Sequence, residues 1–92
     1  MNKLYYQLAG SERAMEKILM NFSDRAKTVH LYQLANEFGA HDYMSVDFHD
    51  EAACTAEFII DLEQAMAISK IKFVSCSEQT LVKAGVLDGK AN

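Results

Sequence analysis

The sequence contains no proline and only four glycines, the residues that most often mark turns and linkers. No internal repeat, low-complexity run or linker divides the chain either. We therefore expect a single domain over residues 1–92, in which residues 86–92 form a frayed tail. The hydrophobic fraction of 50% is ample for one packed core, so the composition does not favour disorder.

Long apolar segments are also missing. No apolar run approaches the roughly 20 residues that a membrane-spanning helix needs, and the first residues lack the apolar stretch of a signal peptide. We expect a cytoplasmic protein with no membrane partner. The two cysteines, Cys54 and Cys76, are then expected to stay reduced, because stable disulfides are rare in that compartment.

Positive charge is absent from the middle of the chain. Residues 28–69 contain eight acidic residues and no Lys or Arg, whereas the flanks hold all nine basic residues and five acidic ones. The net charge of -4 argues against a general nucleic-acid binder, but its distribution predicts one acidic and one basic side. Either the acidic residues only cap and solvate a helix, or they meet a basic protein groove or imitate phosphates while the basic flanks contact nucleic acid.

The spacing that a structural zinc site requires is not found. The possible ligands cluster in one part of the chain: His41, Asp42, Asp47, His49, Asp50 and Cys54. Their spacing matches no zinc motif, and there is no His-Glu-x-x-His pair. We therefore expect surface histidines and helix-capping acids, with no bound metal and no cofactor.

Catalytic motifs are missing as well. Cys54 or Cys76 together with a histidine could form a nucleophile and its base, but no local pattern supports such a pair. Glu57 and Asp61 lie one helical turn apart on a solvated stripe, where paired carboxylates are common and inert. The glycines are isolated, so they form no phosphate-binding loop. We expect no enzymatic activity, no catalytic residue and no small-molecule substrate.

What the sequence does contain is a regular alternation of apolar and polar residues in three segments. Lys3–Ala9, 42–48 and 70–76 place apolar side chains at every second position, which predicts strands. Residues 27–38 fit a strand and a helix about equally, because their apolar residues also have helical spacing up to Phe38.

Two longer segments have helical spacing. After Ser11 as N-cap, apolar residues recur at i, i+3, i+4 and i+7 up to Phe22. Asp50 is predicted to cap a second helix that continues through Ile68 and turns its acidic stripe to water. A short last helix is expected after Ser77.

The resulting order, β-α-β-β-α-β, predicts an α+β ferredoxin-like fold, an antiparallel sheet with two helices on one face. The core is then expected to contain the following side chains: Leu4, Tyr6, Leu8, Met15, Ile18, Leu19, Phe22, Met44, Val46, Phe48, Ile59, Leu62, Met66, Ile71 and Phe73. The other face of the sheet would be left for partners. On that face the alternation places Tyr5, Gln7, Tyr43, Ser45 and Lys72, with Tyr32 if the second strand forms. Tyrosines are enriched at protein interfaces, but they also cover the edges of cores.

Residues 41–48 resemble the eight-residue signature of the RNA-recognition domain, with aromatic residues at Tyr43 and Phe48 and a β-branched residue at Val46. This resemblance implies a sheet that stacks bases. His41 and Asp42 stand where the signature has a basic residue and a glycine, and Ser45 replaces the central aromatic ring. RNA binding in that mode is therefore kept as an alternative.

In size and character the whole chain, from the opening MNKLYYQLAG to the tail LDGKAN, resembles small phage-encoded anti-CRISPR proteins that inhibit type I-F surveillance complexes. The resemblance implies a non-catalytic protein that blocks target DNA binding by occupying a host ribonucleoprotein complex, with possible contact to the guide RNA. Those proteins share no motif, so no residue role is transferred. A host regulatory or adaptor protein is the competing interpretation.

The residues that we expect to contact the partner come from the free sheet face, the basic flanks and the acidic centre. They are Tyr5, Gln7, Arg25, Lys27, Tyr32, Tyr43, Ser45, Asp47, Asp50, Glu57, Asp61, Lys70 and Lys72.

Overall fold

The computed structural model describes residues 3–26, 28–36, 39–48 and 55–85, with the side chains of 34–36 and 39–41 left out. Within these residues the chain forms a four-stranded antiparallel sheet and three α-helices, so the α+β class predicted from the sequence is confirmed. The elements are β1 Lys3–Ala9, α1 Glu12–Phe22, the 3₁₀ turn η1 Ser23–Arg25, β2 Thr28–Asn36, β3 Gly39–Asp47, α2 Ala56–Ile68, β4 Lys72–Cys76 and α3 Glu78–Lys83.

The strand order in the sheet is β2-β3-β1-β4, and each neighbouring pair is antiparallel. The central strands β1 and β3 pair with Tyr6 opposite Met44, so the strands predicted at the start and in the middle of the chain do share one sheet. The ambiguous segment after η1 is the edge strand β2. The apolar residues of this segment also have helical spacing, but the segment forms a strand because it pairs with β3 along its whole length.

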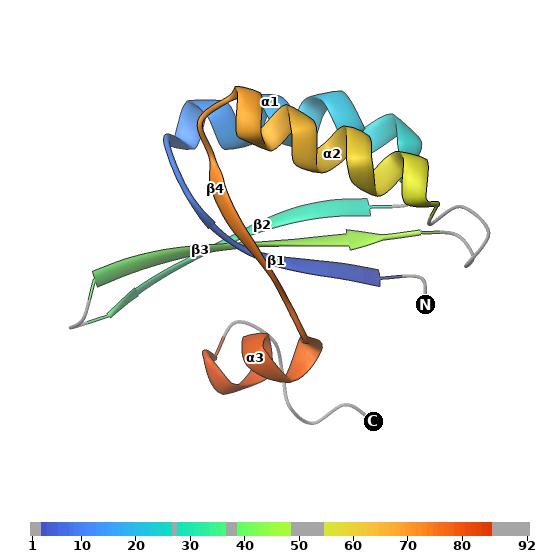
Figure 1. Cartoon of the computed structure of the whole chain (residues 1–92). Coiled ribbons are helices and arrows are strands. Elements are labelled where there is room, and N and C mark those ends of the chain that lie inside the picture. The colour runs from blue at the N-terminus through green and yellow to red at the C-terminus, as the bar shows by residue number, and fades with distance from the viewer. Residues whose placement is uncertain (1–2, 27, 37–38, 49–54, 86–92) are drawn as a thin grey trace.

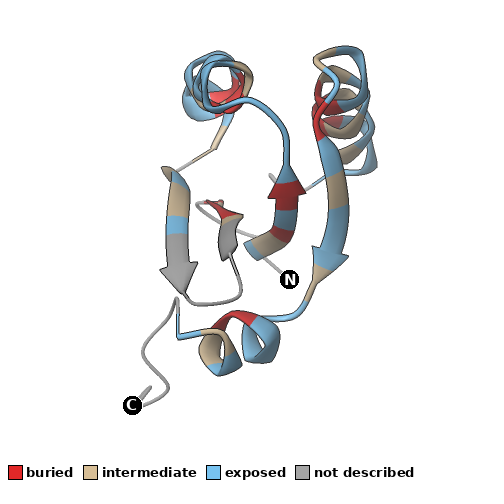
Figure 2. Ribbon diagram, turned by 90° about the vertical axis from the view of Figure 1, so that its left-hand side faces the viewer, coloured by how far each residue is buried: buried red, intermediate tan, exposed pale blue. Residues whose placement is uncertain are grey.

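Helices lie on both faces of the sheet. In Figure 1, α1 and α2 run antiparallel above one face, whereas α3 lies below the other. The expectation that one face stays free is therefore wrong in part. Figure 2 also shows α3 on the opposite side of the sheet from the two long helices, and Leu81 is the one buried residue of this helix.

The start of α1 agrees with the sequence. The backbone N–H of Ala14 donates to the hydroxyl of Ser11 at 3.1 Å, as expected of an N-cap. Met15, Ile18 and Phe22 are buried against the sheet, whereas their neighbour Leu19 is only partly buried and lies outside the core cluster.

The second helix begins later than predicted. Its N-cap is Thr55, whose hydroxyl accepts from the backbone N–H of Phe58 at 3.1 Å, so the expected cap at Asp50 is wrong. Asp50 itself lies outside the described residues. Phe58 is buried in place of Ile59, which was expected in the core and is only partly buried. Phe58 lies four residues before Leu62, and Leu62 four before Met66, so the three buried residues share one face of the helix.

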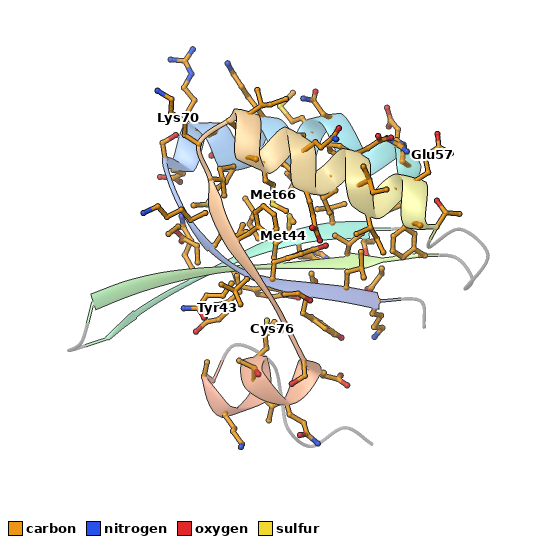
Figure 3. All side chains as sticks on the ribbon, in the orientation of Figure 1. Tyr43, Met44, Glu57, Met66, Lys70 and Cys76 are labelled. Carbon is orange, nitrogen blue, oxygen red and sulfur yellow. The ribbon has the colours of Figure 1, made fainter. Side chains whose placement is uncertain are left out.

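The core lies between the sheet and the two long helices, where Met44 and Met66 meet in Figure 3. Its buried members are Tyr6, Leu8, Met15, Ile18, Phe22, Met44, Val46, Phe48, Phe58, Leu62, Met66 and Ile71, with Leu4 and Phe73 packed against them. Apart from Leu19, Ile59 and the missed Phe58, the predicted core is confirmed. Phe58 packs edge-to-face on both Phe22 and Phe48, at centroid distances of 5.6 and 4.9 Å. No described helix is long and apolar enough to cross a membrane.

Candidate functional site

The register brings together the residues that alternation assigned to the second sheet face. Tyr5 lies opposite Ser45 on one side and Cys76 on the other, and Tyr43 lies opposite both Gln7 and Tyr32. The grouping predicted from the sequence is therefore correct for the strands β1, β2 and β3. What the sequence did not predict is how much of this group α3 covers.

Tyr43 and Ser45 are buried, with exposed fractions of 6% and 4%. In Figure 3, Tyr43 points to the α3 side of the sheet. The expectation that Tyr43 and Ser45 form an accessible contact surface is therefore wrong. Alanine at Tyr43 would remove a packed ring, so we expect it to lower stability as well as any binding.

Tyr5 and Tyr32 remain half-buried at the edges of this face, while Gln7 and Lys72 are exposed. The hydroxyl of Ser45 lies 3.5 Å from that of Tyr32, a long and weak hydrogen bond. Burial, and after it the negative charges of Glu78 and Asp47, raise the pKa of the Tyr5 phenol. The protonated, hydrogen-bonding form of the Tyr5 phenol is thus favoured.

A cavity of about 550 Å³ opens beside Tyr5, between the end of β4 and the start of α3. It is lined by Lys3, Leu4, Tyr5, Ser75, Cys76, Ser77 and Glu78. Burial raises the pKa of the Cys76 thiol, so the protonated thiol is favoured over the nucleophilic thiolate at neutral pH. Among the described residues, no three His, Cys, Asp or Glu side chains are grouped so that they could hold a metal ion.

Several of the charged residues expected to contact a partner have polar or charged partners within the protein. Arg25 and Asp61 form an ion pair, with 3.1 Å between guanidinium and carboxylate. Asp47 accepts a hydrogen bond from the Thr28 hydroxyl at 3.2 Å and lies 4.0 Å from the ammonium group of Lys3. The acidic centre is therefore partly neutralised within the protein. Lys27 and Asp50 lie outside the described residues.

Basic side chains gather at the opposite end of the helical layer, where α1 begins and α2 ends. A pocket of about 250 Å³ lies there, lined by Ser11, Arg13, Ala14, Lys17 and Ser69. Lys70 follows Ser69 directly, and Figure 3 shows it at this end of α2, with Glu57 at the other end. In the described part of the chain, Arg13, Lys17 and Lys70 have no carboxylate within 4.0 Å.

Sequence reasoning identified Lys70 but not Arg13 or Lys17. A usable signal was present, because two cations at i and i+4 share one face of a helix. These two side chains line a pocket together with Ser69 at the end of α2, and this arrangement depends on how the two helices pack.

Comparison of the chain with protein-family models, with curated proteins and with solved structures finds no match in any of the three. The functional argument therefore rests on the charges, contacts and shape of this chain.

Proposed function

We propose that this protein is a non-catalytic, phage-type inhibitor that binds a host type I-F guide-RNA surveillance complex and blocks target DNA binding. It acts in the cytoplasm of the infected bacterium and uses no cofactor. The observation that carries the proposal is a group of cations without carboxylate partners where α1 begins and α2 ends, with the exposed Glu57 at the other end of α2.

The basic end supports contact with nucleic acid. Cations that have no carboxylate partner in their own protein are available to phosphates, and phosphate contacts supply most of the sequence-independent affinity for nucleic acid. Arg13, Lys17 and Lys70 meet this condition, whereas Arg25 and Lys3 are occupied by Asp61 and Asp47.

The other end supports contact with protein. Glu57 is exposed in the first turn of α2, and Ile60 beside it is 54% exposed. A guide-RNA complex holds its RNA in a positively charged protein channel, so it presents phosphates and basic side chains close together. A small protein that presents unpaired cations at one end of α2 and an exposed acid at the other complements such a surface, and charge complementarity of this kind favours correct orientation and fast association.

The same proposal includes the finer description of the fold as ferredoxin-like. The order of the first six regular elements is β-α-β-β-α-β, with η1 between α1 and β2, and the strands β1 and β3 occupy the centre of the sheet. This arrangement places both long helices on one face, as the split βαβ arrangement does. The third helix, α3, is an addition to that plan.

The experiment adds the purified protein to an assembled type I-F complex before labelled target DNA and follows DNA binding by gel shift. We expect DNA binding to be lost at saturating protein. Full DNA binding would contradict the inhibitor function. Protein that binds free guide RNA as tightly as it binds the complex would instead indicate a general RNA-binding protein, a role for which burial of Tyr43 and Ser45 leaves the sheet face poorly suited.

A further inference from the structure

We infer that the pocket at the basic end is a phosphate-binding subsite, formed by Ser11, Arg13, Lys17 and Ser69, that holds one phosphate of a single-stranded nucleic acid. The inference rests on the proposed function for the source of that phosphate, namely the guide RNA. The site itself belongs to the isolated protein and can be tested there.

Close packing of two connections builds the pocket. The link from β1 to α1 passes through Gly10, and a Cβ at that position would lie 3.2 Å from the Cα of Ile71 in the link from α2 to β4. Because no side chain separates the two links, Ser11 and Ser69 come to line the same small space. The pocket is thus made by a close approach that glycine permits.

The acidic and basic side chains of α1 lie on different sides of the helix, and the basic ones line the pocket. Arg13 and Lys17 line the pocket next to α2, whereas Glu12 and Glu16 line a separate cavity next to β2. The acidic residues of the helix therefore face away from the pocket. An anion placed there meets two cations and no carboxylate among the lining residues.

The lining groups match what a phosphate requires. A guanidinium group can donate two parallel hydrogen bonds to phosphate oxygens, and an ammonium group adds a second positive charge. The hydroxyl of Ser11 accepts from Ala14 N–H, which leaves its own proton free to be donated. The volume of about 250 Å³ lies below the roughly 300–1,000 Å³ typical of sites for drug-sized ligands, so a single small group is the better fit.

Lys70 adds a third cation beside the pocket, in a backbone conformation that is unusual for lysine. Its φ is 61°, in the left-handed region, and it occupies the position after the C-cap Ser69. The N–H groups of Lys70 and Ile71 donate to the carbonyls of Ala67 and Met66, at 3.1 and 2.9 Å, which completes a Schellman motif. Glycine is the usual residue at this position, because it has no Cβ to oppose the left-handed conformation. Lysine instead places a positive charge there.

The test uses the isolated, ¹⁵N-labelled protein, titrated with inorganic phosphate and, separately, with a short oligouridylate at constant ionic strength. We expect both probes to shift the amide signals of Ser11, Ala14 and Ser69. The variant Arg13→Gln/Lys17→Gln should bind the oligouridylate at least ~10-fold more weakly, and its slope of log affinity against log salt should fall by about 1.4, at ~0.7 per charge for single strands. Both residues are exposed, so the variant is expected to fold.

The matched control is Lys3→Gln/Lys83→Gln, which removes the same charge from exposed positions away from the pocket. Equal weakening in both double variants would overturn the subsite, because it would show a general charge effect. Amide shifts with inorganic phosphate but not with the oligouridylate would overturn nucleic acid as the source of the phosphate and indicate a small phosphorylated ligand. A subsite that behaves as expected in a protein that fails to block DNA loading would refute the proposed function and leave the site intact.

Discussion

Gly10 lies so close to Ile71 that a methyl group on its Cα would meet both the backbone and the side chain of Ile71 at 3.2 Å. Contacts this tight force a neighbour to move, and here the nearest atom belongs to the backbone. We expect Gly10→Ala to lower the free energy of unfolding by about 1–3 kcal/mol through overpacking. Urea denaturation followed by circular dichroism measures the change. Ala9→Gly, at the exposed neighbouring position, is the control for a general sensitivity of the link between β1 and α1. Unaltered stability of Gly10→Ala would show that this link and the link between α2 and β4 are not tightly packed against each other.

Two substitutions at Lys70 separate the effect of its backbone conformation on stability from the effect of its charge on binding. Lys70→Gly relieves the left-handed conformation and should raise stability by roughly 0.5–1 kcal/mol. Lys70→Ala keeps a Cβ in the same conformation and should bring no such gain. Thermal denaturation of the two variants tests the difference. If Lys70 also contacts phosphates, both variants should bind the oligouridylate more weakly, and equal stability of both would contradict the conformational argument.

Arg25 should contribute more to stability than its ion pair alone explains. Its guanidinium carbon lies 5.5 and 5.0 Å from the ring centres of Phe22 and Phe58, in addition to the contact with Asp61. The ion pair is exposed, so Asp61→Asn should cost less than about 1 kcal/mol. Arg25→Ala should cost more, because packing over two rings is lost as well. A double-mutant cycle with both changes gives the coupling energy, and equal costs for the two single variants would exclude a role for the rings.

Leu81 should hold α3 on the sheet. It is completely buried, and it is the one buried residue of that helix. We expect Leu81→Ala to destabilise the docked α3 by about 2 kcal/mol or more and to expose Tyr43 to solvent. Hydrogen exchange of the α3 amides and the reactivity of Tyr43 report the undocking. Gln79→Ala, an exposed position of the same helix, should leave both unchanged; normal protection in Leu81→Ala would mean that α3 is held by other contacts.

Cys76 should react slowly at neutral pH. Burial raises the pKa of its thiol in the folded protein above the ordinary value of 9.0, so the folded state retains a proton that the unfolded state releases. Stability should therefore decline as the pH rises above that ordinary value. Alkylation by iodoacetamide in a Cys54→Ser background should reach half its maximal rate above pH 9.0. A half-maximal rate near or below neutral pH would instead show an activated thiolate.

Apolar periodicity by itself determined the α+β class, the central strands and most of the core. Leu4, Tyr6 and Leu8 alternate strictly, and Met15, Ile18 and Phe22 follow one helical stripe, so only one face of each element could be buried. The alternation also grouped Tyr5 and Tyr43 on one sheet face, because the side-chain period of a strand allows no other placement.

Tertiary structure decided the features that depend on distant segments. Residues 28–36 became a strand because pairing with β3 outweighs helical spacing, and Tyr43 is buried although its face of the sheet was expected to be open. The net charge of each segment was visible in the sequence. Which charges cancel was not, because Arg25 of η1 reaches Asp61 of α2, while Arg13 and Lys17 have no carboxylate within 4.0 Å in the described part of the chain. Composition fixes how many charges a chain carries, whereas their partners depend on the contacts that packing creates.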